Sequence, residues 1–175
     1  MFLAGYTLVP ISLSSIDVVR NWRNDPSISD NMDYQEFITD AAQQKWFESL
    51  NNSENYYYLI KSKQQFIGLI HLNCFDEIKM TAHAGLFIGE KKYRGTGASL
   101  AASILILSFA FETLDLRSIY AKVNKNNSEI IKYNHLLGFV IDSEMDEKFQ
   151  LYILTTEKFR EKKQSLINLL SAVNQ

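Results

Sequence analysis

The chain has 175 residues, 46% of them hydrophobic and 13% aromatic, and its formal net charge is −2. This length and composition predict one compact domain over residues 1–175 and exclude a disordered chain, while the near-neutral charge argues against a dedicated nucleic-acid binder. A single cysteine, Cys74, excludes an internal disulfide and a Cys-rich zinc site, so we expect no metal and a reducing, cytoplasmic setting.

Hydrophobic spacing in the first half of the chain predicts both helices and strands. The expected elements are a strand over residues 6–11, helices over 14–22 and 39–50, and strands over 56–61 and 66–73. The stretch 23–38 contains Pro26 and many polar residues, so we expect it to be irregular.

The second half continues the alternation of strands and helices. The expected elements are a strand over 81–88, a helix over 100–114, a strand over 117–123, a helix over 128–137, strands over 139–141 and 149–155, and a helix over 157–173. Such interleaving predicts an α/β sandwich. The longest apolar run, at 100–111, is too short to span a bilayer, and the N-terminus lacks the pattern of a signal peptide, so we expect no membrane insertion.

The most informative motif lies between the strand and the helix at the centre of the chain. It reads Arg94, Gly95, Thr96, Gly97, Ala98, Ser99. A glycine-bearing turn at a helix N-terminus presents free backbone N–H groups and the positive end of the helix dipole, which suit a pyrophosphate. The spacing excludes a dinucleotide fingerprint, because Leu100 stands where a third glycine is required, and no Gly-Lys-Ser/Thr ending of an NTPase loop is present.

A second motif follows the strand expected at 117–123. Asn127 is followed eleven residues later by Gly138 and Phe139. The two motifs, in this order, resemble the GCN5-related N-acetyltransferase (GNAT) family, whose pyrophosphate loop reads Arg/Gln-x-x-Gly-x-Gly/Ala; here the last position holds Ser99. The resemblance implies a mixed, mostly antiparallel sheet with helices on both faces, and acetyl-CoA or another short acyl-CoA as co-substrate.

The resemblance also implies which backbone groups meet the co-substrate. Coenzyme A would contact the turn at 94–99 and Asn127. In the family, a β-bulge in the central strand aims a backbone amide at the acyl carbonyl, and by position that amide belongs to Phe87 or Ile88 in this chain.

The acid and the base of the reaction are less defined by the sequence. The family's tyrosine acid falls on Asn134, whose amide can hydrogen-bond the sulfur but cannot act as an acid. Tyr133 beside it is either a replacement acid or a packing residue. His83 is the candidate base, with a satisfied histidine on a sheet face as the alternative. His71 is expected to be structural and His135 to face solvent.

The first fifty residues suggest the acceptor. Trp22-Arg23-Asn24, Asn31-Met32 and Lys45-Trp46-Phe47 resemble bacterial GNAT enzymes that acylate nucleotide-linked amino sugars, of the pseudaminic-acid pathway acetyltransferase type. That resemblance implies a dTDP- or UDP-linked amino-deoxysugar used for surface polysaccharide. The candidate acceptor-binding residues are Arg23, which could pair with a diphosphate, Asn24, Met32, Tyr34 and Trp46. For Trp22 and Trp46, packing between helices is the alternative.

Two other functions stay open at this point. Acetylation of a polyamine or a protein N-terminus would favour acidic residues near the acceptor, and the candidates are Glu36, Asp40, Asp76 and Glu77. A catalytically silent acyl-CoA sensor would fit the missing tyrosine at Asn134. The apolar surface of the C-terminal helix is compatible with a homodimer or with a cover for the sheet.

Overall fold

The computed structural model describes residues 1–50 and 55–173, and its strands form a single eight-stranded sheet in the order β1-β2-β3-β4-β5-β6-β8-β7. The strands are β1 Phe2–Leu3, β2 Tyr6–Pro10, β3 Tyr56–Ser62, β4 Gln65–Asp76, β5 Thr81–Ile88, β6 Ser118–Asn124, β7 Val140–Glu144 and β8 Phe149–Thr155. All neighbours pair antiparallel except β5 and β6, which are parallel.

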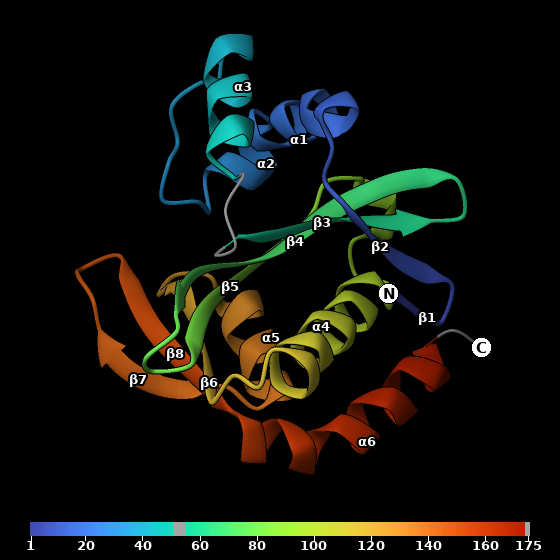
Figure 1. Cartoon of the computed structure of the whole chain (residues 1–175), viewed down its shortest axis with the longest axis vertical. Helices are drawn as coiled ribbons and strands as arrows, with labels where there is room; N and C mark the ends of the chain where they lie inside the picture. Colours follow the sequence, from blue (N-terminus) through green and yellow to red (C-terminus); the bar gives the residue numbers. More distant parts are fainter. Residues whose placement is uncertain (51–54, 174–175) are drawn as a thin grey trace.

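Helices cover both faces of this sheet (Figure 1). They are α1 Ile16–Arg23, α2 Pro26–Ser29, α3 Asp40–Ser49, α4 Ala98–Ser108, α5 Ser128–Leu137 and α6 Thr156–Val173. The first three lie together on one face, and α4, α5 and α6 lie on the other (Figure 1). This mixed, mostly antiparallel α/β architecture confirms the fold expected from the sequence.

The main core is built around α4. Eight of its eleven residues are buried, so the helix is apolar almost all round, as expected for a helix enclosed between a sheet and another helix. It begins at Ala98 and is extended by a π-helical turn, Phe109–Thr113. Within the described part of the chain, no helix is both long enough and apolar enough to cross a membrane.

The expected irregular stretch at 23–38 contains one short helix, α2. Asp25 precedes it, and its side chain accepts a hydrogen bond from the backbone N–H of Ser27. Pro26 occupies the first helical position, where its fixed φ favours the helix and its missing N–H costs nothing. A helix this short leaves no hydrophobic period in the sequence, which explains why the pattern did not predict it.

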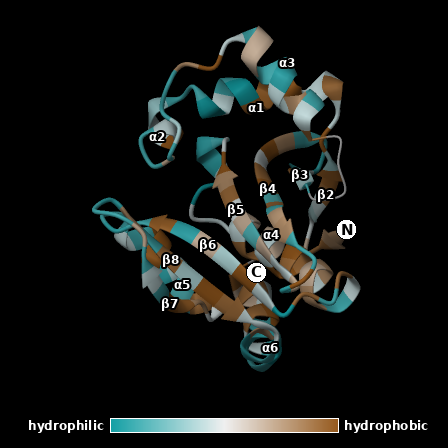
Figure 2. Ribbon diagram, turned by 60° about the vertical axis from the view of Figure 1, so that its left-hand side comes forward, coloured by the Kyte–Doolittle hydropathy of each residue, from teal (hydrophilic) through white to brown (hydrophobic). Residues whose placement is uncertain are grey.

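The sheet divides at β5 and β6, its one parallel pair among residues 1–50 and 55–173. Pairing between β5 and β6 covers Thr81–Ser118, Ala82–Ile119 and His83–Tyr120, and then stops. Beyond His83, β5 continues beside β4 toward α1 and α2, while β6, β8 and β7 turn away (Figure 2). Residues 84–88 therefore have a strand neighbour on one side only.

The packing of one face of α6 against the core can be tested by mutation. Leu166 is 1% exposed in the core and Leu169, on the same helix, is 40% exposed. We expect Leu166→Ala to lower the free energy of unfolding by about 2–5 kcal/mol, because it leaves a cavity, and Leu169→Ala by less than about 0.5 kcal/mol. Urea denaturation of both variants measures this; equal losses would contradict the placement of α6.

Candidate functional site

The turn before α4 has the free backbone donors expected of an anion site. No partner within the described residues is recorded for the backbone N–H groups of Gly95, Gly97, Ser99 and Leu100. Gly95 has φ +74°, and no atom lies within 4 Å of the place where a Cβ would stand. The turn is thus open on the side where a ligand would approach the backbone.

Side chains of the same turn fix its shape. Arg94 donates from Nε to the carbonyl of Ile88 at 3.1 Å and from its guanidinium to Ser27 Oγ at 3.1 Å, which ties the turn to the end of β5 and to α2. Thr96 donates to the carbonyl of Tyr93 at 2.7 Å and accepts from the N–H of Ala98 at 3.3 Å. The side chains of Arg94 and Thr96 therefore fix the conformation of the loop, while its backbone N–H groups stay available for a ligand.

The prediction of a bulge at Phe87 or Ile88 is wrong, because the bulge lies just after these residues. The pairing of β4 with β5 runs without a register shift from Gly68–Ile88 to Asn73–His83. The irregularity comes later, where the N–H groups of Gly89 and Glu90 both donate to the carbonyl of Ile67, at 2.9 and 3.1 Å. Double donation to one carbonyl is the pattern of a bulge, and here the ring of Trp22 fills the space beside Gly89.

The side chains of Phe87 and Ile88 do not offer polar chemistry. The ring of Phe87 packs edge-on against Trp22, with centroids 6.2 Å apart, and Ile88 is buried in the core beneath α4. Only the backbone of these two residues is suited to a ligand running along the free edge of β5.

Helix α5 carries two of the candidate catalytic residues. The hydroxyl of Tyr133 lies 2.7 Å from Ser103 Oγ on α4, and burial raises the pKa of the phenol well above its usual value. This environment favours the packing interpretation of Tyr133. Asn134 is buried and its carbonyl closes the helix by accepting from the N–H groups of Gly138 and Phe139. Its side-chain amide has no hydrogen bond recorded within residues 1–50 and 55–173.

Asn127 is the N-cap residue of α5, and its side chain also contacts the segment after α2. Its Oδ1 accepts from the N–H of Ile130 at 3.1 Å, and its Nδ2 donates to Asn31 Oδ1 at 3.1 Å. Close by, Lys122 on β6 pairs with Asp33 at 2.7 Å. The segment after α2 is therefore connected to the far half of the sheet.

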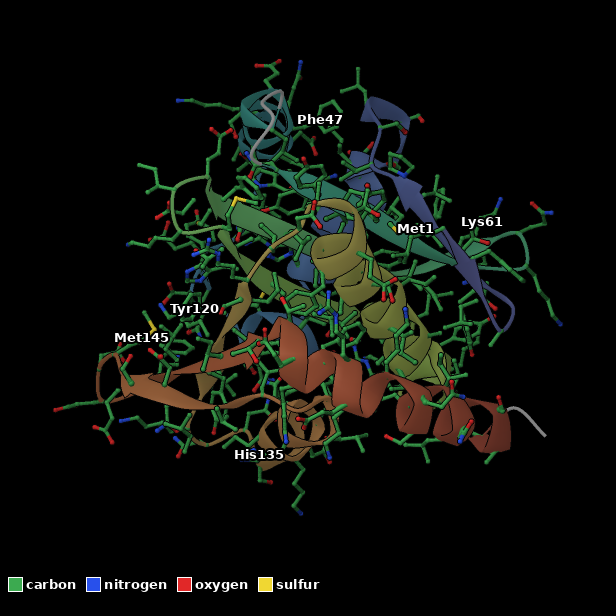
Figure 3. All side chains as sticks on the ribbon, turned by 60° about the horizontal axis from the view of Figure 1, so that its bottom comes forward. Met1, Phe47, Lys61, Tyr120, His135 and Met145 are labelled. Atoms are coloured by element: carbon green, nitrogen blue, oxygen red, sulfur yellow. The ribbon has the colours of Figure 1, made fainter. Side chains whose placement is uncertain are left out.

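The three histidines have different surroundings. His83 is half-buried at the last position of β5 that pairs with β6, its ring is 5.5 Å from that of Tyr120, and burial lowers its pKa. His135 is exposed and lies at the periphery of the molecule (Figure 3), with Nδ1 3.1 Å from the carbonyl of Phe139. These placements leave His83 as the candidate nearer the divergence of β5 and β6.

His71 lies closer to that divergence than the sequence suggested. Its ring stacks on Tyr57 with centroids 4.6 Å apart, and it occupies the space above Gly85, where a Cβ would be 2.7 Å from Nε2. Burial first, and then the charges of Arg23 and His83, lower the pKa of His71 to about 4. Tyr57 also accepts a hydrogen bond from Asn73 Nδ2 at 3.2 Å.

The sequence did not single out this group of Tyr57, His71, Asn73 and Gly85. Its members come from three neighbouring strands and meet only through the register of the sheet. One signal was present in the sequence, since a glycine inside a strand pattern often marks a place where another group approaches the backbone.

Among the candidate acceptor residues, Arg23 is the most unusual. It is partly buried, its pKa is lowered mainly by that burial, and no salt bridge or hydrogen bond of its guanidinium is recorded for the described chain. By contrast, Arg20 on the same helix pairs with Asp40 at 2.6 Å and Asp17 at 3.8 Å. A buried cation without a counter-ion is costly unless an anion binds there.

Of the other candidate acceptor-binding residues, some are engaged in the packing and hydrogen bonding of the fold, and Tyr34 is exposed. Asn24 is bonded through both amide atoms to the backbone of Ile38, at 3.0 and 2.8 Å, so it fixes the loop. Trp46 packs edge-on against Tyr57 at 5.3 Å, and Met32 packs against the cluster around Trp22. Tyr34 is exposed, with its hydroxyl 3.3 Å from Glu36.

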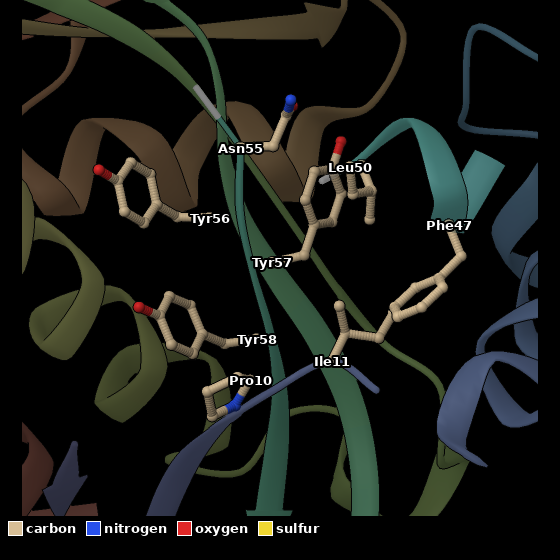
Figure 4. Close-up of a pocket in the computed structure, with 8 residues that line it drawn as sticks. All are labelled: Pro10, Ile11, Phe47, Leu50, Asn55, Tyr56, Tyr57 and Tyr58. Atoms are coloured by element: carbon tan, nitrogen blue, oxygen red, sulfur yellow. The ribbon is translucent and has the colours of Figure 1, made fainter. Parts of the chain in front are cut away.

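A cavity of about 260 Å³ opens beside this group, between β3 and α3. Its lining residues are Pro10, Ile11, Phe47, Leu50, Asn55, Tyr56, Tyr57 and Tyr58. Tyr57 points to the same side of β3 as Phe47 and Leu50, and Tyr56 and Tyr58 point to the other (Figure 4). Tyr57 is thus shared by the cavity and by the stack on His71.

Two of the acidic residues considered for a polyamine are engaged elsewhere. Asp40 pairs with Arg20, and Asp76 accepts from the N–H groups of Ile78 and Lys79 at 3.0 and 2.9 Å while pairing with the Lys79 side chain. Glu77 is exposed at that same turn.

Comparison with known proteins agrees with this geometry. The sequence profile of the family described as "Acetyltransferase (GNAT) domain" matches residues 6–140. An uncharacterised N-acetyltransferase, p20, from Bacillus licheniformis is 26% identical over 145 residues, which cover 79% of this chain and 81% of that protein.

Several solved structures share the fold, and two of them differ in the substrate that their descriptions name. A spermidine N-acetyltransferase from Vibrio cholerae, in complex with CoA and spermine, matches with a TM-score of 0.80 at 18% identity and covers 90% of this chain and 99% of its own. Apo FdhC, a nucleotide-linked sugar GNAT, matches with a TM-score of 0.81 at 21% identity and covers 95% and 96%.

The hydrogen-bonded hydroxyls of Tyr133 and Ser103 give a test of the role of Tyr133. Tyr133→Phe leaves Ser103 without its partner, so we expect a loss of about 1–2 kcal/mol in the free energy of unfolding and unchanged turnover per folded molecule. Adding Ser103→Ala should recover part of the loss, because both polar groups are then gone. A fall in turnover of a hundredfold or more with unchanged stability would instead make Tyr133 the acid.

Proposed function

This chain belongs to the acetyltransferase (GNAT) domain family, and from that premise we propose that it transfers an acetyl or short acyl group from coenzyme A to the amine of a nucleotide-linked amino-deoxysugar. Family membership makes it a CoA-dependent N-acyltransferase. The identity of the amine, a dTDP- or UDP-linked sugar for surface polysaccharide, is the proposed part.

The fit of the co-substrate rests on the turn and the free edge of β5. Unpartnered N–H groups at Gly95, Gly97, Ser99 and Leu100 suit the pyrophosphate of coenzyme A. Backbone groups of residues 84–88 lack a strand on the β6 side, so the two amides of an extended pantetheine arm can pair there as an added strand would. Such an arrangement brings the thioester toward the point where β5 and β6 separate.

The single observation that carries the acceptor proposal is the free charge of Arg23. An anionic acceptor supplies the counter-ion that the described residues do not, and a guanidinium pairs well with a diphosphate. A polyamine would bring further positive charge to this group. The two solved relatives act on different acceptors by their descriptions, so the choice rests on the electrostatics of this chain.

The reaction is a direct transfer in a ternary complex. The amine nitrogen attacks the thioester carbon, a C–N bond forms, the C–S bond breaks, and the amine proton ends on the released thiol. In this proposal His83 helps to remove that proton, and the side-chain amide of Asn134 hydrogen-bonds the sulfur. A CoA thiolate is a tolerable leaving group, so proximity and charge stabilisation supply the rate without a tyrosine acid.

The test of the acceptor is a panel of amines incubated with acetyl-CoA. We expect thiol release with dTDP- or UDP-linked amino-deoxysugars, and little with spermidine or with peptides bearing a free N-terminus. Turnover of spermidine alone would replace the sugar by a polyamine, and CoA binding without turnover of any amine would make the protein an acyl-CoA sensor.

Arg23 and Arg20 form a matched pair for a second test. Arg23→Gln should raise the KM of the sugar nucleotide about 10- to 100-fold, because a charged hydrogen-bonding partner of the diphosphate is lost, with the KM of acetyl-CoA unchanged. Arg20→Gln should leave both constants within about threefold, since Asp17 and Asp40 already balance Arg20. Steady-state kinetics of the two variants decide this; equal effects would remove Arg23 from the acceptor site.

A further inference from the structure

We propose that His71 donates a hydrogen bond from Nε2–H to the carbonyl oxygen of the acyl thioester and stabilises the negative charge that develops there. The inference adds a residue to the site of the proposed function and rests on acyl transfer at that site, whichever amine accepts the group.

The first argument is where the ring lies. His71 pairs with Gly85 on β5 and with Tyr57 on β3, and its ring occupies the space that any side chain at position 85 would take. Gly85 lies two residues after His83, which is the last residue of β5 that pairs with β6. The imidazole therefore covers the stretch of β5 that has lost its neighbour, which is where the thioester is expected.

The second argument is that neither ring nitrogen is used within the fold. Nδ1 is sealed from solvent and has no partner among the described residues, while Nε2 is not sealed and has no hydrogen bond recorded either. A buried N–H without an acceptor is rarer than a buried acceptor without a donor. This preference puts the hydrogen on Nε2, the nitrogen that a ligand can reach.

The third argument concerns charge. The titratable and charged groups facing His71 are Tyr57 from β3, His83 from β5 and Arg23 from α1. Burial, together with Arg23 and His83, lowers the pKa of His71 to about 4. The ring is consequently neutral above about pH 5, and a neutral imidazole is a poor proton acceptor here but a constant hydrogen-bond donor.

The chemistry of transfer needs such a donor. Because β5 has no bulge at Phe87 or Ile88, the expected distortion that would aim one of those amides at the carbonyl is missing. When the amine attacks, the carbonyl π electrons move to oxygen, and the Nε2–H of His71 meets that charge. The C=O bond then reforms as the C–S bond breaks, and His71 keeps its proton throughout. Neutral histidine serves as an electrophile of this kind in other enzymes.

The test compares two substitutions of His71, one that keeps the aromatic ring and one that keeps an N–H donor. His71→Phe retains a ring over Gly85 and on Tyr57 but has no donor, and His71→Gln retains an N–H near the position of Nε2. With any amine that the wild-type protein acylates, we expect His71→Phe to lower kcat about 10²- to 10³-fold with the KM of acetyl-CoA within about threefold, and His71→Gln to lose less than about tenfold. His135→Gln, on the exposed side of α5, is the control and should match the wild type.

The pH profile separates a donor from a base. The loss in His71→Phe should be the same at pH 6 and pH 9, since His71 does not titrate in that range. A loss that disappears at high pH would make His71 the base, and equal kcat values in His71→Phe and the wild type would overturn the inference while leaving turnover of the sugar nucleotide standing.

A readout independent of activity is available from ¹⁵N-labelled histidine. We expect the NMR signals of His71 to report a neutral ring with hydrogen on Nε2 from pH 5 to pH 8, with His135 as the internal reference for an exposed ring. Hydrogen on Nδ1, or a midpoint near the ordinary value of about 6.5, would overturn the inference. Thermal denaturation of each variant ensures that the kinetics report folded protein.

Discussion

The separation of β5 from β6 after His83 is the constraint on which the site depends. Up to that residue the sheet is continuous, and beyond it β5 has a partner only in β4. A strand with one free edge exposes backbone donors and acceptors, which is normally a hazard, but here the edge runs between the open turn at 94–100 and a group of polar side chains. The same divergence leaves the backbone of residues 84–88 without a strand on the β6 side, and the ring of His71 lies over Gly85 within that stretch.

The layer of α1, α2 and α3 carries charged residues that influence the electrostatics of the site. Several charged groups near it are paired within the fold: Arg20 with Asp40, Lys122 with Asp33, and Lys91 with Asp25 at 3.5 Å. Arg23 differs because it is partly buried, interacts electrostatically with Tyr57 and Tyr34, and has no salt bridge or hydrogen bond of its guanidinium recorded within the described residues.

Much of the fold followed from the sequence, because its strongest signals are local. The turn at 94–99, the apolar α4 and the late motif ending at Gly138 all lie in continuous stretches, and Gly138 takes the left-handed conformation, φ +103°, that ends a helix. The group around His71 could not be found this way, since β3, β4 and β5 bring its members together only by register. Tyr133 and Asn134 show the same limit: adjacent in sequence, they point into different surroundings, and no pattern indicated that Ser103 would engage the phenol.

The segment that includes α2 and the residues after it contacts both halves of the divided sheet. Arg94 and Lys91, beyond the end of β5, hold α2, and Asn31 and Asp33 hold Asn127 and Lys122 on the opposite side. This segment is therefore attached at two places, to the turn that follows β5 and to the β6–α5 side of the molecule. Because surface ion pairs are individually worth only about 0–1 kcal/mol, the Lys91–Asp25 and Lys122–Asp33 pairs add little each to the attachment of this segment, which can shift relative to the sheet at a small cost in free energy.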